Sequence, residues 1–176
     1  MDKKGEVDNL SKIVKPEIGI ITNISGAHFK NFKTLKDIAK AKSEIINNIS
    51  KNGNIILNKD VEFFNLFLNK AKKNGINVTS FSLRKKSDIF LSSIKKIKNH
   101  FRLKINVRNK IFFFDTKNIT ESFLNNILAW ISTMFVLNLN LNKIKKIFTT
   151  FKIPEGRGDI KMINKFNKRF KFIDES

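Results

Sequence analysis

The segment of residues 16–45 constrains the fold of this 176-residue chain more than any other. It opens with a short run that is apolar on both faces, formed by Ile18, Ile20, Ile21 and Ile24. Such a run is typical of a strand buried inside a parallel sheet. The run breaks at Ser25-Gly26, and His28 follows just past the expected carboxyl end of the strand. Because ligands of open α/β sheets gather outside that end of the strands, His28 is a candidate site residue.

A helix is expected after this strand. Thr34 belongs to a residue type that caps helix N-termini. The residues that recur at helical spacing behind it are Leu35, Ile38, Ala39, Lys42 and Ile45. We expect this helix to run to about Ile49, before a turn at Asn52-Gly53-Asn54.

The same pattern repeats further along the chain. Residues 55–57 predict a short buried strand, residues 63–71 an amphipathic helix ending at Asn74-Gly75, and residues 78–81 another strand. Two successive strand–helix units require right-handed crossovers and hence a parallel sheet. A short helix from about Glu6 is expected to precede the first strand and to end at Pro16.

The periodicity changes after residue 88. Alternating residues predict antiparallel strands at 89–97, 101–107 and 111–114. Two helices that bury apolar residues between 124 and 148 follow, and residues 160–173 are expected to form a closing hairpin. The predicted fold class is therefore α/β, a mostly parallel sheet flanked by helices, with a small antiparallel subdomain at 88–115.

The formal charge of +20 at pH 7 has two interpretations. Clustered Lys and Arg side chains neutralise phosphates, so a basic nucleic-acid-binding module is one alternative. The other is compositional drift. Lys, Asn, Ile and Phe are all heavily used and share A/T-rich codons, and lysines occur in nearly every segment of the chain. We favour drift over nucleic acid, and the charge should still attract polyanionic substrates such as nucleotides.

The composition also bears on compartment and metal chemistry. The chain contains no cysteine, which excludes disulfides and thiolate metal sites. Residues 1–15 are charged and have no apolar leader segment, and the apolar stretch 123–141 is interrupted by six polar residues. We therefore expect a cytoplasmic protein without a membrane partner.

The segment from Thr22 to Ile45 resembles the central, ATP-binding domain of the Mur ligases. It joins Thr22-Asn23, Ala27-His28 and Ala41-Lys42-Ser43-Glu44-Ile45 at the spacing of that family. Within the family the segment is most similar to the group that adds D-alanyl-D-alanine to UDP-N-acetylmuramoyl-tripeptide. The resemblance implies ATP and Mg²⁺ as cofactors and an amide ligation of peptidoglycan precursors through an acyl phosphate. Alternatives within the superfamily are the ligase for the third amino acid and the folylpolyglutamate or cyanophycin synthetases.

The resemblance implies metal-binding roles for two residues. His28 matches a ligand of a magnesium ion that bridges ATP and the acceptor carboxylate, and Lys42 matches a carbamylated lysine. An ammonium group cannot coordinate a cation, so this role requires CO₂ to convert the Lys42 amine into an anionic carbamate. On residue type alone, His28 could be a loop histidine bonded to backbone, and Lys42 a solvated helix lysine. Glu44 could orient the site or be exposed.

The resemblance also implies nucleotide contacts. Asn58 and Asp60 match an Asn-x-Asp-Asp pattern near the adenine, although its second Asp is Val61 here. Asn126 matches an adenine-contacting Asn, with Trp130 in place of a small residue. A helix-surface Asn is the alternative for Asn126, and core packing is the preferred interpretation of Trp130.

Two further matches lie near the end of the chain. Arg157, in Gly156-Arg157-Gly158, matches an arginine that contacts phosphate, and the alternative is a turn arginine. Asp174 matches a hinge aspartate that accepts hydrogen bonds from the ribose hydroxyls. Residues 173–176 resemble the start of the hinge to a C-terminal domain.

The start of the chain carries a related implication. Met1, Gly5, Glu6 and Val7 match a family run that lies downstream of the nucleotide-binding loop. No Gly-rich loop ending in Lys-Ser or Lys-Thr occurs in these residues. We therefore expect residues 1–176 to form the C-terminal portion of a central domain, and we expect this polypeptide to be inactive by itself.

Overall fold

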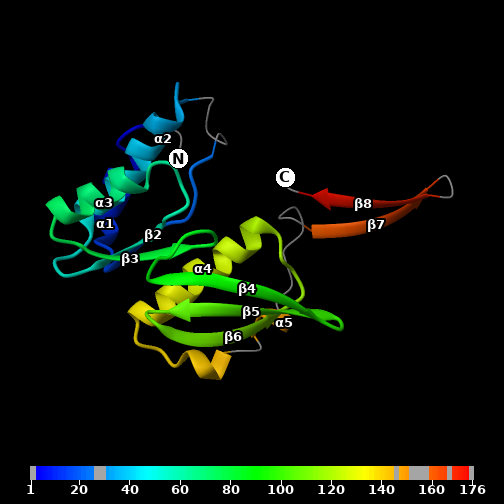
Figure 1. Cartoon of the computed structure of the whole chain (residues 1–176). Helices are drawn as coiled ribbons and strands as arrows, with labels where there is room; N and C mark the ends of the chain where they lie inside the picture. Colours follow the sequence, from blue (N-terminus) through cyan, green and yellow to red (C-terminus); the bar gives the residue numbers. More distant parts are fainter. Residues whose placement is uncertain (1–2, 26–30, 145–146, 151–158, 166–167, 175–176) are drawn as a thin grey trace.

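A six-stranded mixed sheet organises the computed structural model, which describes residues 3–25, 31–144, 147–150, 159–165 and 168–174 (Figure 1). The strands, in spatial as well as chain order, are β1 (Ile18–Ile21), β2 (Asn54–Asn58), β3 (Asn77–Ser82), β4 (Ile89–Ile97), β5 (His100–Val107) and β6 (Lys110–Thr116). The pairs from β1 to β4 are parallel, and the pairs from β4 to β6 are antiparallel. The expected parallel units and the expected antiparallel strands are therefore both present, and they belong to one sheet.

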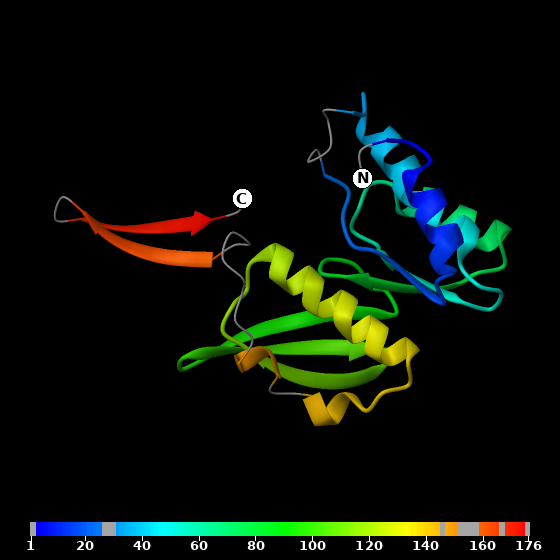
Figure 2. The ribbon, with the colours of Figure 1, turned by 180° about the vertical axis from the view of Figure 1, so that it is seen from behind.

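Helices cover both faces of this sheet (Figures 1 and 2). One side carries α1 (Glu6–Val14), α2 (Leu35–Lys42), the 3₁₀ helix η2 (Ser43–Asn48) and α3 (Phe64–Lys73). The other side carries α4 (Glu121–Val136), which packs on β2, β3 and β4. The short η3 (Leu141–Ile144) and α5 (Ile147–Thr150) follow α4. No helix in the described part of the chain is long and apolar enough to cross a bilayer.

The alternation of side chains along β2 explains the two-sided core. Ile55 and Leu57 pack with η2 and α3, whereas Ile56 packs in the cluster that contains the α4 residues Ile127 and Leu128. All three β2 side chains are fully buried. A strand buried on both faces needs apolar residues at consecutive positions, which is the pattern that β2 shows.

The N-terminus of α2 forms as expected. The Thr34 hydroxyl accepts a hydrogen bond from the Asp37 amide at 3.2 Å, and the Asp37 carboxylate accepts one from the Thr34 amide at 3.1 Å. This reciprocal capping box satisfies two backbone donors at the helix start. The helical segment reaches about Ile49 as expected, but its type changes on the way, because the α-helix ends at Lys42 and continues as 3₁₀ helix to Asn48. At the change, the Ser43 hydroxyl donates to the Lys40 carbonyl at 2.6 Å and competes with helical bonding there.

The first strand differs from the prediction in length and burial. It ends at Ile21, so Ile24 lies beyond it, and Ile20 is 41% exposed although we expected both faces to be covered. Ile18 packs against the α4 core, but α4 runs over β2, β3 and β4 and leaves Ile20 largely open.

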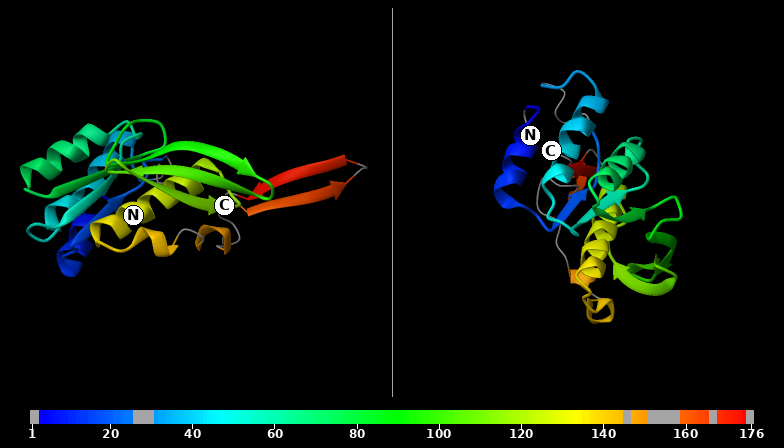
Figure 3. Two further views of the ribbon diagram at one scale, coloured as in Figure 1. Left: turned by 60° about the horizontal axis from the view of Figure 1, so that its bottom comes forward. Right: turned by 90° about the vertical axis from the view of Figure 1, so that its left-hand side faces the viewer.

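The expected closing hairpin is present as a second, two-stranded sheet. It consists of β7 (Asp159–Lys165) and β8 (Lys168–Asp174), paired antiparallel with Asp159 opposite Asp174. In Figures 1 and 3 the hairpin extends away from the six-stranded sheet.

Candidate functional site

A cavity of about 300 Å³ lies at the carboxyl ends of β1, β2 and β3. Asn23 follows β1, Asn58 ends β2, and Arg84 follows β3. The first turns of α4 complete the wall with polar residues that include Asn125. Polar side chains converge here because parallel strands bring the loops after them to the same edge of the sheet, where α/β proteins bind ligands.

Asn58 connects three parts of this edge. It is only 3% exposed, and its amide nitrogen donates to the Thr22 carbonyl at 2.9 Å and to the Asn125 side-chain oxygen at 3.3 Å. Its side-chain oxygen accepts a hydrogen bond from the Asp60 amide at 2.9 Å. The residue therefore joins the end of β1, the start of α4 and the loop after β2.

Asp60 joins the same loop to the end of β3. Its carboxylate accepts hydrogen bonds from the Ser82 hydroxyl and the Leu83 amide, each at 2.7 Å. Asn58 and Asp60, both expected near a nucleotide, thus lie at one cavity and also hold its walls together.

Lys42 reaches this edge from the last turn of α2. Its ammonium nitrogen lies 2.9 Å from the Asn23 carbonyl oxygen, and Asn23 lines the cavity. Partial burial lowers the pKa of Lys42 below the ordinary lysine value, because the charged form loses hydration. A lysine with a lowered pKa carries a larger fraction of the neutral, nucleophilic amine at a given pH.

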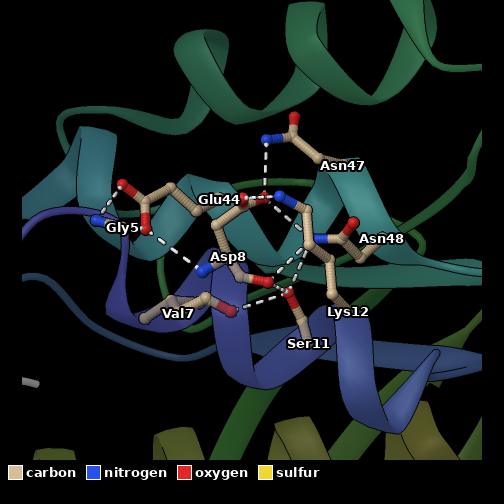
Figure 4. A network of polar contacts seen from close by, with 8 residues as sticks. All are labelled: Gly5, Val7, Asp8, Ser11, Lys12, Glu44, Asn47 and Asn48. Carbon is tan, nitrogen blue, oxygen red and sulfur yellow. Dashed lines mark hydrogen bonds and ion pairs between the residues drawn. The ribbon is translucent and has the colours of Figure 1, made fainter.

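Glu44 binds the start of α1 (Figure 4). Its two carboxylate oxygens accept hydrogen bonds from the Gly5 amide at 2.9 and 3.1 Å, and one of them accepts from the Asp8 amide at 3.2 Å. Gly5 is the N-cap residue with a positive φ of 85° and offers no capping side chain, so Glu44 supplies the anion that a helix N-terminus favours. Glu44 is half-buried, so simple exposure does not describe it, and its hydrogen bonds hold the residues that follow Lys42 to α1.

The network continues along α1 (Figure 4). The Asp8 carboxylate pairs with Lys12 at 2.6 Å and accepts a hydrogen bond from the Asn48 amide group at 2.9 Å. These bonds from Lys12 and Asn48 lower the pKa of Asp8, because they favour its charged form. Asn48 also donates to the Ser11 hydroxyl at 2.9 Å, which ties η2 to the buried side of α1.

Asn126 lies at a different cavity from Asn58. That space of about 270 Å³ is mostly apolar and is lined by Phe123, Asn126, Ile127, Trp130, Ile147 and Phe148. Trp130 packs edge-to-face on Phe148 with ring centroids 5.2 Å apart, which confirms its interpretation as a packing residue. The structure therefore brings Asn58, Asp60 and Asn125 together, and it places Asn126 on a separate surface of α4.

Three expected site residues are described partly or not at all. His28 and Arg157 lie outside the described residues. Asp174 is the last residue of β8, and its backbone pairs with Asp159. Among the described residues, no group of three or more His, Asp or Glu side chains is arranged to hold a metal ion.

Sequence reasoning missed two features of the cavity wall. Asn125 carried no motif signal, because the family pattern begins one residue later. Arg84 and Glu121 form an ion pair in which the single nitrogen Nη2 of Arg84 lies 2.8 Å from both carboxylate oxygens of Glu121. The pair closes one side of the cavity between the end of β3 and the start of α4.

Residues 1–134 match the family model described as the Mur ligase middle domain. The chain belongs to the Mur ligase family. Over 170 residues it is 32% identical to the UDP-N-acetylmuramoyl-tripeptide--D-alanyl-D-alanine ligase of Rickettsia prowazekii, covering 96% of this chain and 37% of that protein. The chain thus spans little more than a third of this relative's length.

Solved structures agree with the family assignment. The crystal structure of MurF from Acinetobacter baumannii matches with a TM-score of 0.83 and 26% identity, covering 100% of this chain and 37% of that one. MurF from Thermotoga maritima, solved in complex with ADP, matches with a TM-score of 0.75 at 20% identity, over 91% of this chain and 36% of that one. At 20% identity, the match to the Thermotoga maritima structure shows a similarity of fold.

Proposed function

We propose that this chain is part of an ATP-dependent ligase that joins D-alanyl-D-alanine to UDP-N-acetylmuramoyl-tripeptide in peptidoglycan precursor synthesis. The observation that carries the proposal is the 32% identity to a ligase of that name over 96% of the chain. We further propose that residues 1–176 are the C-terminal portion of a central domain, with 88–115 as its antiparallel part and 173–176 as the start of a hinge. The proposal places the protein in the cytoplasm.

Lys42 is the residue whose described geometry best supports this chemistry. Its lowered pKa increases the fraction of neutral amine, which can add to CO₂ with formation of an N–C bond and release of a proton. The product is an anionic carbamate at the carboxyl edge of the sheet, where Lys42 already contacts Asn23. We propose that this carbamate and His28 would hold a magnesium ion. Bound Mg²⁺ would supply neutralisation of the crowded phosphate oxygens.

We propose that the cavity at Asn58 and Asp60 takes part in nucleotide binding. Asn58 and Asp60 are held by hydrogen bonds to several loops, so the edge is preorganised for a ligand. From the resemblance we also propose that Asn126 contacts the adenine from the separate apolar cavity on α4, that Asp174 accepts hydrogen bonds from the ribose hydroxyls, and that Arg157 contacts the transferring phosphoryl group. A guanidinium fork suits the charge that develops there.

The reaction itself follows from the substrates. The terminal carboxylate of the tripeptide attacks the γ-phosphate of ATP, the bond to the β–γ bridging oxygen breaks, and an acyl phosphate forms as ADP leaves. The amine of D-alanyl-D-alanine then attacks the acyl carbon, and phosphate leaves as the amide bond forms. The third-residue, folylpolyglutamate and cyanophycin ligases stay alternatives that share the first of these steps.

The test replaces the corresponding region of the Rickettsia prowazekii ligase with this chain and measures ATP-dependent phosphate release. We expect release that requires both UDP-N-acetylmuramoyl-tripeptide and D-alanyl-D-alanine, and no release by this polypeptide alone. Lys42→Ala should abolish release, whereas Lys40→Ala, at an exposed position on the same helix, should retain it. A folded chimera that releases phosphate only with a different acceptor would contradict the proposal.

A further inference from the structure

A second cavity, of about 430 Å³, lies apart from the carboxyl edge of β1, β2 and β3. Its walls come from the turn between β5 and β6, from the last turn of α4 and from the segment that leads to η3. In Figures 1 and 2 the end of α4 and this turn lie at the same end of the antiparallel half of the sheet. The cavity shares none of the described lining residues of the cavity at Asn58, and its volume is typical of sites that bind small organic molecules.

The lining of this cavity combines an apolar surface with positive charge and amide groups. The apolar part consists of two aromatic and three aliphatic side chains, Phe112, Phe135, Val107, Leu139 and Leu141. The polar part consists of two cations and three amides, Arg108, Lys110, Asn138, Asn140 and Asn142. Among the described residues, no Asp or Glu side chain lines the cavity. This composition suits a ligand that carries both a negative charge and an apolar body.

Arg108 is held above the apolar floor of the cavity. Its guanidinium carbon lies 5.2 Å from the centroid of the Phe135 ring, and stacking of this kind orients the planar cation. Phe135 belongs to the last turn of α4, where the helix dipole also favours a positive charge. The Arg108 side chain is 56% exposed, and within the described residues no hydrogen bond involves its two terminal nitrogens. Those nitrogens can therefore donate to a ligand.

Asp88 anchors Arg108 from outside the cavity. Nε of Arg108 lies 3.4 Å from one Asp88 carboxylate oxygen, and the Arg108 amide donates to the Asp88 carbonyl at 2.8 Å. The other carboxylate oxygen accepts hydrogen bonds from the amide and the hydroxyl of Ser80 at 2.9 and 2.7 Å. Arg108 adopts a left-handed φ of 43°, in which its Cβ crowds the carbonyl oxygen. Such strain is typical of a residue that presents its side chain in one required direction.

Lys110 adds a second cation on the same side of the sheet. It starts β6 directly opposite Val107, so the two side chains point to the same face, and Phe112 follows on that face two residues later. Val107 is buried in the cluster that contains the α4 residues, whereas Lys110 is exposed. The apolar floor therefore continues into a positively charged rim.

We propose that this cavity binds a small organic anion, a carboxylate or a phosphate ester that is attached to a flat apolar ring. The ring packs on Phe112 and Phe135, and the anionic group accepts hydrogen bonds from Arg108 and Lys110. A guanidinium group suits this role because it binds a carboxylate or a phosphate through two parallel hydrogen bonds. The proposal goes beyond the ligation chemistry, since none of the described residues of the proposed ligase site lines this cavity.

The experiment titrates this chain, labelled with ¹⁵N, with phenyl phosphate and follows the backbone amide shifts by NMR. We expect saturable shifts at Arg108, Lys110 and Asn138, with a Kd in the low millimolar range or tighter. Inorganic phosphate lacks the ring and benzyl alcohol lacks the charge, so each should bind at least about tenfold more weakly. Benzoate carries a carboxylate instead of the phosphate, and the tighter of the two ring-bearing probes identifies the preferred anionic group.

Two results of the titration would overturn the proposal. Shifts that are as strong with inorganic phosphate as with phenyl phosphate would show attraction of charge alone. Shifts confined to the cavity at Asn58 would place the ligand at the other site.

Substitutions then test the side chains. Arg108→Gln and Lys110→Gln each remove one cation and should each weaken binding of phenyl phosphate by about tenfold. Lys95→Gln removes the same charge at an exposed position on β4, outside the cavity, and should leave the Kd within about twofold. Leu139→Asp places a negative charge in the wall, at a side chain that is 47% exposed, and should abolish binding.

The variants also separate this proposal from the others. Leu139 lies outside the turn between β5 and β6, so Leu139→Asp keeps the test valid if Arg108→Gln disturbs that turn. Equal affinity of the Lys95→Gln, Lys110→Gln and Leu139→Asp variants would overturn the proposal. Because no measurement involves ATP or a ligase substrate, failure here is distinct from failure of the ligase proposal.

Discussion

Glu44 binds the backbone of Gly5 across 39 positions of sequence, with oxygen-to-nitrogen distances of 2.9 and 3.1 Å. The contact joins the two family motifs of the N-terminal half, because Gly5 belongs to the first and Glu44 stands two residues after Lys42 in the second. The start of η2, which directly follows Lys42, is thereby held to the start of α1 (Figure 4).

Removing this carboxylate should destabilise the chain. Glu44→Ala leaves the Gly5 and Asp8 amides without their acceptor, and loss of such a cap costs about 1–2 kcal/mol. Urea unfolding followed by circular dichroism measures the change. Glu62→Ala, at an exposed position, is the control and should stay within about 0.5 kcal/mol of the parent. Equal stability of the two variants would contradict the capping role.

The Asp8 carboxylate predicts a pH dependence. Hydrogen bonds from Lys12 and Asn48 lower its pKa in the folded state. Its contribution is therefore fully present above the unfolded-state pKa of about 4 and is lost as the pH falls through the lower folded-state pKa. Asp8→Asn should flatten the loss of unfolding free energy below about pH 4, as measured by urea titrations at several pH values. Lys12→Met should act in the same direction, and an unchanged acid slope in both variants would refute this origin.

The lowered pKa of Lys42 predicts selective reaction with CO₂. With ¹³C-bicarbonate, a carbamate signal should form at lower pH than for ordinary lysines, because burial increases the fraction of neutral amine. Carbon NMR measures the signal, which Lys42→Ala should remove and Lys40→Ala should leave. Persistence of the signal in Lys42→Ala would show that another amine is modified.

Asn58 and Asn126 should differ in their effect on stability. Asn58→Ala removes three hydrogen bonds at a site that is 3% exposed, and leaving buried partners unpaired costs about 2–3 kcal/mol. Asn126 is exposed, so Asn126→Ala should change the free energy of unfolding by no more than about 0.5 kcal/mol. Thermal and urea unfolding of the two variants measure the contrast. A loss at Asn126 as large as that at Asn58 would be inconsistent with this packing.

The net charge predicts only weak association with nucleic acid. If the +20 charge reflects composition, retention on heparin or DNA should vanish near physiological salt, because contacts from scattered lysines are easily screened. A salt titration on a heparin column measures this. Retention well above physiological salt would favour the basic nucleic-acid-binding module.

The order of strands and helices could be predicted because each repeats a local periodicity. The Thr34 cap was also predictable, since the capping side chain and its backbone partner are three residues apart. The change from α-helix to 3₁₀ helix after Lys42 could not be predicted, because it depends on the hydrogen bond that the Ser43 hydroxyl donates to the Lys40 carbonyl. The exposure of Ile20 could not be predicted either, because it depends on the path of α4 over the sheet.

The loops that form the candidate site could be predicted from the sequence, but the surface that each side chain faces could not. Family motifs pointed to Asn58 and Asp60, which do lie at one cavity. Asn125 and Asn126 are neighbours in sequence, and a rotation of about 100° per residue separates the surfaces that they face. No motif carries that information without the packing of α4.

The parallel and antiparallel halves of the sheet meet along a narrow seam. Between β3 and β4 only Phe81 with Ile89 and Ser82 with Phe90 are in register, whereas α4 packs on strands of both halves. The backbone pairing between β3 and β4 is thus short, and α4 packs across the junction between the two halves of the sheet. Loss of the α4 packing should therefore make the two halves of the sheet open more independently of each other.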